Sequence, residues 1–276
     1  MQYIVPQQRL SRLVGWFANT RIGLIKRILI RGFIKRYRVD MSIAANPDPD
    51  SYPTFNAFFT RALGAEKRPI SDAPHDIVCP ADGTISEIGK IDRGRLLQAK
   101  GRYFTVTDLL GGDAAPAKSF DNGLFATIYL SPKDYHRVHM PCGGTLTTMI
   151  HIPGTLFSVN GDTAATVTRL FARNERVIAL FDTDIGPMAV IMVGAMIVAG
   201  IETVWSGQVT PAGRRIQTIH YGHSQLPVTL KRGAEMGRFM LGSTVIVLLP
   251  PNCAAWEPSL RAQSPVVMGQ RLGCIG

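Results

Sequence analysis

Side chains that could support chemistry are concentrated in three short segments, and the first segment contains two histidines. His136 and His139 lie in YHRVHMP at 135–141, and their spacing suits acid–base catalysis, metal binding or a structural role. Pro132 and Pro141 flank the segment, so a long helix with both rings on one face is not expected. No other cluster with metal-ligand spacing accompanies the two histidines, and we expect no metal.

An aspartate and a serine elsewhere in the chain could work with one of these histidines. Asp82 lies in PADG at 80–83 and Ser243 in LGST at 241–244. Taken alone, they resemble an ordinary turn residue and an ordinary strand-edge residue. A serine hydroxyl becomes a nucleophile when a base takes its proton and a carboxylate orients that base. Asp82, a histidine and Ser243 are therefore a candidate triad for nucleophilic chemistry.

The elements that must position these side chains are predicted to be mostly strands. Apolar runs broken by glycine, proline, asparagine and aspartate predict strands over 123–130, 177–181, 188–198, 203–205 and 244–249. The uncharged run 185–201 is shorter than the ~20 residues of a membrane-spanning helix, and its valines, isoleucines and glycines favour buried strands. Residues 42–53 predict a loop, and 55–63 predict a short amphipathic helix.

The N-terminal segment has a different character. The chain carries a formal charge of +10, and its first 40 residues hold nine lysines and arginines but one acid. Apolar residues lie between the basic ones at helical spacing, namely Ile22, Ile25, Ile28, Leu29, Phe33 and Tyr37, after a cluster of Leu10, Leu13, Val14, Trp16 and Phe17. Such helices suit an anionic membrane surface. The alternative is a helix that packs on the body with a solvated basic face.

Composition excludes several classes of protein. Hydrophobic residues make up 46% of the chain and charged residues 18%, which excludes a disordered or coiled-coil protein. Four cysteines without a CxxC pair exclude a zinc ribbon and indicate a reducing compartment. No groove-reading motif accompanies the basic segment, so nucleic acid is not an expected partner.

Seven motifs in this order resemble the pyruvoyl-dependent bacterial phosphatidylserine decarboxylases over nearly the whole chain. YHRVHMP and LGST are the most specific of them. The motifs are FNAFFTRAL with Arg68-Pro69 (55–69), PADGTI (80–85), LSPKDYHRVHMPC (130–142), PGTLFSVN (153–160), LFARNERV (170–177), GPMAVIMVGAMIVAGIETVW (186–205) and EMGRFMLGSTVI (235–246). We therefore expect an α+β fold, with basic helices in a membrane-associating region over 1–70 and a β-rich catalytic domain over 71–276.

The resemblance implies a proenzyme that cleaves itself between Gly242 and Ser243. Asp82, His139 and Ser243 would form the relay for this cut, which gives a β chain, 1–242, and an α chain, 243–276. Ser243 would become a covalent pyruvoyl cofactor that forms a Schiff base with phosphatidylserine, and His136 would donate a proton during decarboxylation. The family also implies a homo-oligomer and peripheral attachment to the cytoplasmic face of the inner membrane.

Two other functions remain open from the residues alone. An uncleaved Ser243–His139–Asp82 triad could hydrolyse a lipid ester, and the chain would then stay in one piece. A non-catalytic lipid-binding protein would tolerate loss of the Ser243 hydroxyl without any change in the state of the chain.

Overall fold

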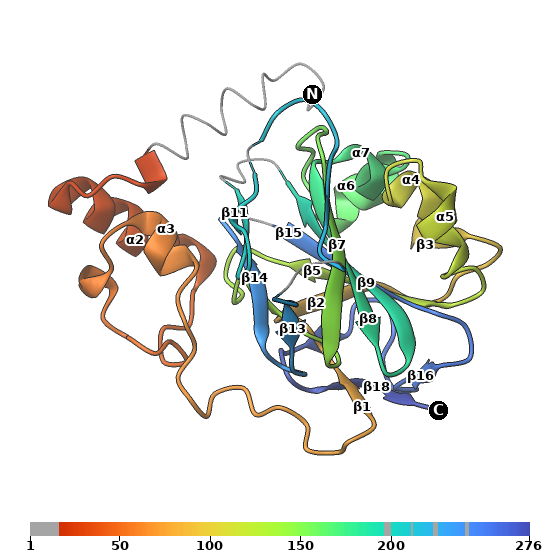
Figure 1. Cartoon of the computed structure of the whole chain (residues 1–276). Coiled ribbons are helices and arrows are strands. Elements are labelled where there is room, and N and C mark those ends of the chain that lie inside the picture. Colours follow the sequence, from red (N-terminus) through yellow and green to blue (C-terminus); the bar gives the residue numbers. More distant parts are fainter. Residues whose placement is uncertain (1–16, 196–199, 211, 223–225, 241–242) are drawn as a thin grey trace.

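The fold is a group of N-terminal helices followed by a mostly β body, as the sequence predicts (Figure 1). The computed structural model describes residues 17–195, 200–210, 212–222, 226–240 and 243–276. Of the predicted apolar cluster, Leu10, Leu13, Val14 and Trp16 lie outside these residues, and Phe17 is the first residue described. Among the described helices, none is long and apolar enough to cross a membrane.

The N-terminal helices form a hydrophobic cluster of their own. The cluster joins α2 (Gly23–Tyr37), η1 (Pro49–Ser51) and α3 (Phe55–Phe59). Phe33 of α2 is its centre, with its ring 5.1–6.1 Å from the rings of three phenylalanines on α3. Lys26 ties the same face of α2 to the 50–52 segment, because its ammonium group donates to two backbone carbonyls there.

The sequence prediction for this region needs two corrections. The apolar positions of α2 do not form one buried face: Ile30 is buried and Phe33 packs against the cluster, whereas Ile22, Ile28 and Leu29 are exposed. The helix predicted over 55–63 ends at Phe59. It stops there because the Thr60 amide folds back onto carbonyls of the last turn and Leu63 pairs with Ala44 in an isolated bridge.

A nine-stranded antiparallel sheet forms the body. Eight strands follow the order β12-β7-β8-β9-β15-β5-β2-β17, and β13 also pairs with β7. In that order their bounds are Gln217–His220, Gly144–Ile152, Arg176–Thr183, Gly186–Gly194, Ser243–Leu249, Leu124–Leu130, Gly83–Lys90 and Pro265–Val266, with β13 at Thr229–Leu230. The uncharged run 185–201 therefore supplies strand β9 rather than a membrane span, and 196–199 lie outside the described residues.

Three smaller sheets complete the β-structure. The first has the order β11 (Gly207–Gln208), β10 (Ile201–Thr203), β14 (Glu235–Phe239) and β6 (Arg137–His139). The second joins β1 (Asp76–Val78), β18 (Arg271–Ile275) and β16 (Ala254–Trp256), and the third is the hairpin β3 (Arg95–Ala99) and β4 (Arg102–Thr105). The strand predicted over 203–205 is wrong in its bounds, since β10 ends at Thr203 and a turn follows.

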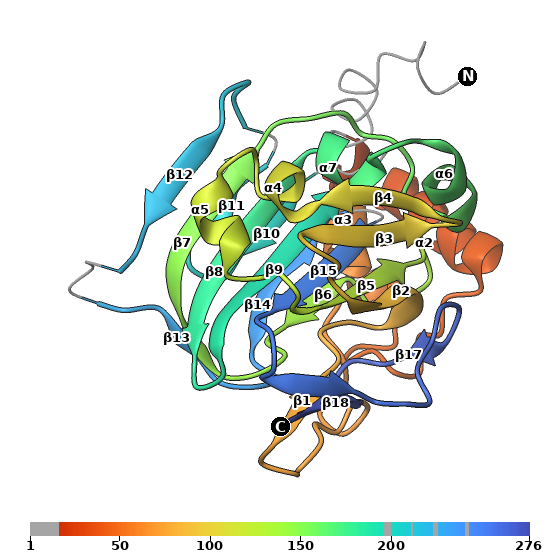
Figure 2. The same cartoon turned by 90° about the vertical axis from the view of Figure 1, so that its right-hand side faces the viewer.

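The large sheet has a hydrophobic core on each face, and β15 contributes to both. Val245, Val247 and Leu249 join the core shared with the β6–β14 sheet, whereas Ile246 and Leu248 join the other core. Figure 2 shows the β3–β4 hairpin lying over the second face together with α4 (Val106–Leu109), α5 (Ala114–Lys118), α6 (Gly161–Thr166) and α7 (Leu170–Arg173). Side chains alternate along a strand, so Ser243 faces the first core.

Candidate active site

The segments that carry Asp82, His139 and Ser243 lie at the same end of the large sheet. Ser243 opens β15 and pairs with Leu130 at the end of β5, and Asp82 immediately precedes β2 on the other side of β5. Adjacent strands lie ~4.8 Å apart, so the two backbones are about two strand spacings from each other. The His139 amide donates to the Pro80 carbonyl at 2.8 Å, which brings the histidine segment to the same place.

Asp82 is held by an arginine rather than by a histidine. Arg68 donates from Nη2 and Nε to the Asp82 carboxylate at 2.6 and 2.9 Å, and the Met268 amide donates to Oδ1 at 2.8 Å. The Asp82 side chain is 8% exposed, and its hydrogen bonds raise the pKa of Arg68. Among the described residues, no hydrogen bond joins Asp82 to His139. In the uncut chain, the Asp82 carboxylate therefore acts on His139 through its negative charge, which favours the protonated ring.

The orientation of His139 comes from a backbone carbonyl. Its Nδ1 lies 2.8 Å from the Gly233 carbonyl, and its Nε2 lies 3.0 Å from the Tyr135 hydroxyl. A carbonyl only accepts, so Nδ1 carries the proton and Nε2 accepts from Tyr135. Burial lowers the pKa of His139, against the Gly233 hydrogen bond and the nearby carboxylates of Glu235 and Asp82. His139 is thus a neutral base whose lone pair is occupied by Tyr135.

Gly233 needs to be a glycine at this position. Its φ is +76°, a left-handed conformation that side chains rarely adopt. An added Cβ would also lie 2.9 Å from Ile70. Sequence reasoning missed Gly233 and Tyr135 and gave Arg68 no role, although Arg68 and Tyr135 both lie in family motifs.

His136 is buried with one ring nitrogen bound and the other free. Nδ1 donates to the Asp134 carbonyl at 2.8 Å, and the ring lies 4.1 Å from the ring of Phe59 on α3. Nε2 is buried and has no hydrogen-bond partner within the described part of the chain. Burial lowers the pKa of His136 to about 3, and the positive charge of Arg61 acts in the same direction. His136 is therefore neutral at pH 7.

Ser243 combines complete burial with a free hydroxyl. Its Oγ has no hydrogen-bond partner in the described ranges, although the residue is 0% exposed. Its strand is the most enclosed of the sheet, with antiparallel partners from Leu130 to Leu124 on one side and from Gly194 to Ala189 on the other. A buried hydroxyl without a partner costs about 1–3 kcal/mol, and a catalytic role is one of the reasons for which such a group is kept. Gly242 lies outside the described residues.

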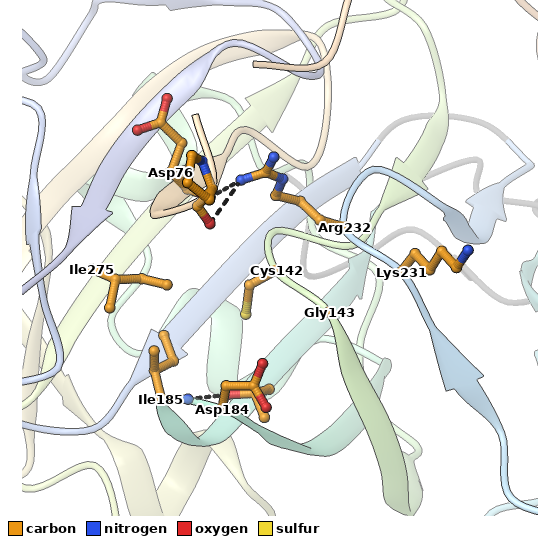
Figure 3. A pocket seen from close by; sticks show the side chains of 10 residues that line it. Asp76, Cys142, Gly143, Asp184, Ile185, Lys231, Arg232 and Ile275 are labelled. Carbon is orange, nitrogen blue, oxygen red and sulfur yellow. Dashed lines mark hydrogen bonds between the residues drawn. The ribbon is translucent and has the colours of Figure 1, made fainter. Parts of the chain in front are cut away.

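A cavity of about 300 Å³ lies at the junction of β1, β7 and the β8–β9 hairpin (Figure 3). It is separate from the site formed by the predicted residues. Arg232 closes one wall and donates to the Pro74 and Asp76 carbonyls. None of the four predicted site residues lines it. Its walls come from Pro74, Asp76, Cys142, Gly143, Thr183, Asp184, Ile185, Lys231, Arg232 and Ile275. Among the residues that the structure describes, no group of three or more His, Cys, Asp or Glu could hold a metal ion.

Comparison with known proteins identifies relatives over the whole chain. A family model described as phosphatidylserine decarboxylase matches residues 55–274, and a second, described as PSD, matches residues 1–38. A phosphatidylserine decarboxylase proenzyme of Ectopseudomonas mendocina is 58% identical, over 99% of this chain and 96% of the relative. Proenzymes of the same name from Bordetella pertussis and Pseudomonas putida are each 56% identical over 98% of this chain, and over 92% and 95% of their own lengths.

Proposed function

The chain belongs to the phosphatidylserine decarboxylase family, and we propose that it is a proenzyme that cleaves itself between Gly242 and Ser243 before it acts on phosphatidylserine. The product is phosphatidylethanolamine. The observation that carries the proposal is the buried Ser243 hydroxyl, which has no partner among the described residues and lies at the sheet end that the Asp82 and His139 segments also reach. The family depends on a pyruvoyl group, and its derivation from Ser243 is part of the proposal.

Self-cleavage follows from the residue types at the junction. The Ser243 hydroxyl attacks the carbonyl carbon of Gly242 and loses its proton to a base, so the peptide bond becomes an ester. Loss of the Ser243 α-proton then expels the Gly242 carboxylate. The dehydroalanine that remains takes up water and releases ammonia, which leaves the α chain with its pyruvoyl end. His139 is the base in this proposal, and its Nε2 becomes available once the Tyr135 hydroxyl turns away.

His136 is the proposed proton donor in the decarboxylation. When present, the pyruvoyl group accepts the electrons that are released as CO₂ leaves. A proton must then reach the carbon that lost CO₂. His136 is neutral in the resting chain, with Nδ1 fixed by Asp134 and Nε2 free. An anionic headgroup beside the ring favours the imidazolium form, so substrate entry itself would raise the pKa of His136 and charge the donor.

The α chain, 243–276, would stay with the β chain after the cut. Strand β15 lies between β5 and β9, and β18 pairs with β1 of the other chain. The Met268 amide also donates to Asp82 across the two chains. A homo-oligomer remains a prediction.

Peripheral attachment to the cytoplasmic face of the membrane is the proposed location. Leu24 and Ile28, one turn apart on α2, are 68% and 63% exposed, and Ile22 lies nearby at 59%. Arginines accompany them: Arg27 and Arg31 each lie near the Asp50 carboxylate, at 3.4 and 2.8 Å. Exposed aliphatic side chains beside arginines suit the headgroup region of an anionic bilayer.

An intact-mass measurement on the denatured protein tests the proposal. The chain should give two masses that meet at Gly242/Ser243, with the small chain lighter by one ammonia than a serine-started peptide. Ser243→Ala should give one full-length, inactive chain. Thr244→Val is the matched control, because Thr244 is the next residue and its hydroxyl is also buried without a partner among the described residues. It should still be cut.

Two results would contradict the proposal. One is an α fragment from the Ser243→Ala chain. The other is a wild-type chain that stays full-length and reacts with a serine-directed phosphonate, which would indicate the lipid hydrolase.

A further inference from the structure

Two arginines are buried in the described part of the chain, and they differ in how their guanidinium groups are satisfied. Arg176 donates four hydrogen bonds of 2.7–2.9 Å to backbone carbonyls, which use all three of its nitrogens. Arg61 is 1% exposed and donates one hydrogen bond, from Nη2 to the Lys133 carbonyl at 3.2 Å. Its Nε and Nη1 have no partner among the described residues.

Within the described ranges, no ion pair neutralises the charge of Arg61. The carboxylates whose charges act on it are bound elsewhere: Asp82 by Arg68, Asp134 by the amide and hydroxyl of Ser131, and Asp40 by the Ser42 amide. The remaining contact of the Arg61 guanidinium is the ring of Phe58, whose centroid lies 5.4 Å away. A buried cation without an anion is unfavourable, so its retention indicates an anion that binds there.

Arg61 lies beside the proposed proton donor. His136 Nδ1 donates to the Asp134 carbonyl and Arg61 Nη2 donates to the Lys133 carbonyl, so two consecutive carbonyls of one turn hold the two side chains. The Arg137 guanidinium donates to the Thr60 carbonyl at 2.9 Å, which fixes the residue before Arg61 to the start of β6. Arg61 and His136 are therefore both held by one turn, and each has a buried nitrogen without a partner among the described residues.

Arg61 also follows α3, which packs on α2, the helix with the exposed apolar side chains. A phospholipid that enters from a membrane bound at α2 would bring its headgroup past α3. In phosphatidylserine the phosphodiester lies between the glycerol and the serine part, only a few covalent bonds from the amino group. The position of Arg61, between the membrane helices and His136, matches that order of groups.

We propose that Arg61 binds the phosphodiester of the substrate headgroup. It would thereby position the serine part of the headgroup beside His136 and the pyruvoyl group made from Ser243. This assignment rests on the proposed function. The headgroup also has a carboxylate, but that group loses its negative charge as CO₂ forms. A cation paired with it would stabilise the substrate more than the transition state and would slow the reaction. The phosphodiester keeps its charge throughout, so a charge-assisted hydrogen bond from Arg61 to it stabilises substrate and transition state alike.

Kinetics of Arg61→Met in neutral detergent micelles test the assignment. Loss of a charge-assisted hydrogen bond should raise KM for phosphatidylserine roughly 10- to 100-fold, with a smaller change in kcat. Arg61→Lys should recover part of the loss, because it keeps the charge but not the fork of donors. Inhibition by phosphatidylethanolamine, which has the phosphodiester but no carboxylate, should weaken by the same factor as KM rises. Unchanged inhibition would overturn the phosphodiester assignment in favour of the carboxylate.

Two further measurements separate this assignment from a structural role and from failure of the proposed function. In the uncleaved Ser243→Ala chain, Arg61→Met should leave the urea midpoint unchanged or higher, because it removes an unpaired buried charge. Arg176→Met should lower it, because that arginine satisfies four carbonyls. A similar fall for Arg61→Met would overturn the proposal. The Arg61→Met chain, with Ser243 present, should still cleave itself. A wild-type chain that fails to cleave would contradict the proposed function rather than the role assigned to Arg61.

Discussion

The burial of a neutral histidine predicts a specific acid sensitivity of the folded chain. The perturbation is His136→Asn in the Ser243→Ala protein, which should stay in one piece and so allow reversible unfolding. An asparagine amide can still donate to the Asp134 carbonyl from nearly the place of Nδ1. The substitution therefore removes the titrating group and keeps the hydrogen bond.

The magnitude follows from the difference between two pKa values. His136 has a pKa of about 3 in the folded chain because burial disfavours the imidazolium, and about 6.5 in an unfolded chain. Between these values the unfolded state binds one more proton than the folded state, so stability is complete above pH 6.5 and falls as the pH falls. Integration from pH 7 to pH 5 gives a loss of about 2 kcal/mol from this one residue.

Urea unfolding at several pH values between 5 and 7 measures this loss. His139, whose pKa burial also lowers, adds a loss of the same sign, and Asp134, whose pKa burial raises, contributes with the opposite sign. Both are present in the variant, so the difference between the two slopes isolates His136. His75→Gln is the control for loss of an imidazole, because His75 is exposed in the folded chain.

Equal slopes in the two proteins would refute the reasoning. They would mean that His136 is already charged in the folded chain or that it is reached by water. In either case its role as a donor that charges only when substrate enters would be wrong.

Two other changes have expected outcomes. In the Ser243→Ala chain, Arg68→Met should reduce the free energy of unfolding by about 3 kcal/mol, because it leaves the buried Asp82 carboxylate with the Met268 amide alone. A free energy of unfolding, measured in urea, within about 1 kcal/mol of the parent would contradict the pairing. The double variant Leu24→Glu, Ile28→Glu should lose co-sedimentation with anionic vesicles and keep its fold. The control Tyr103→Glu, which changes an exposed side chain of β4, should still bind the vesicles. Retained binding of the double variant would place the membrane contact elsewhere.

The α+β fold could be predicted from the sequence, and the four candidate site residues could be named from it, because the signals are local. Apolar runs broken by glycine and proline predicted strands β5 and β15 to within one residue at each end, and strand β8 to within two. The family motifs around Asp82, His136, His139 and Ser243 are contiguous in the chain, so each could be recognised without knowing its neighbours in space. The basic character of the first 40 residues likewise needs only counting.

The partners of those residues were decided by the tertiary structure alone. Asp82 binds Arg68, 14 residues away, and Met268, 186 residues away, while His139 is oriented by Gly233, 94 residues away. No period or spacing encodes such pairs, because they depend on which strands lie side by side. The same reason applies to α2, where spacing identifies the apolar positions but only packing against α3 determines that Phe33 is covered and Ile28 is left exposed. Composition likewise cannot show that one buried arginine is satisfied and another is not, since that depends on the carbonyls that the fold places around each guanidinium group.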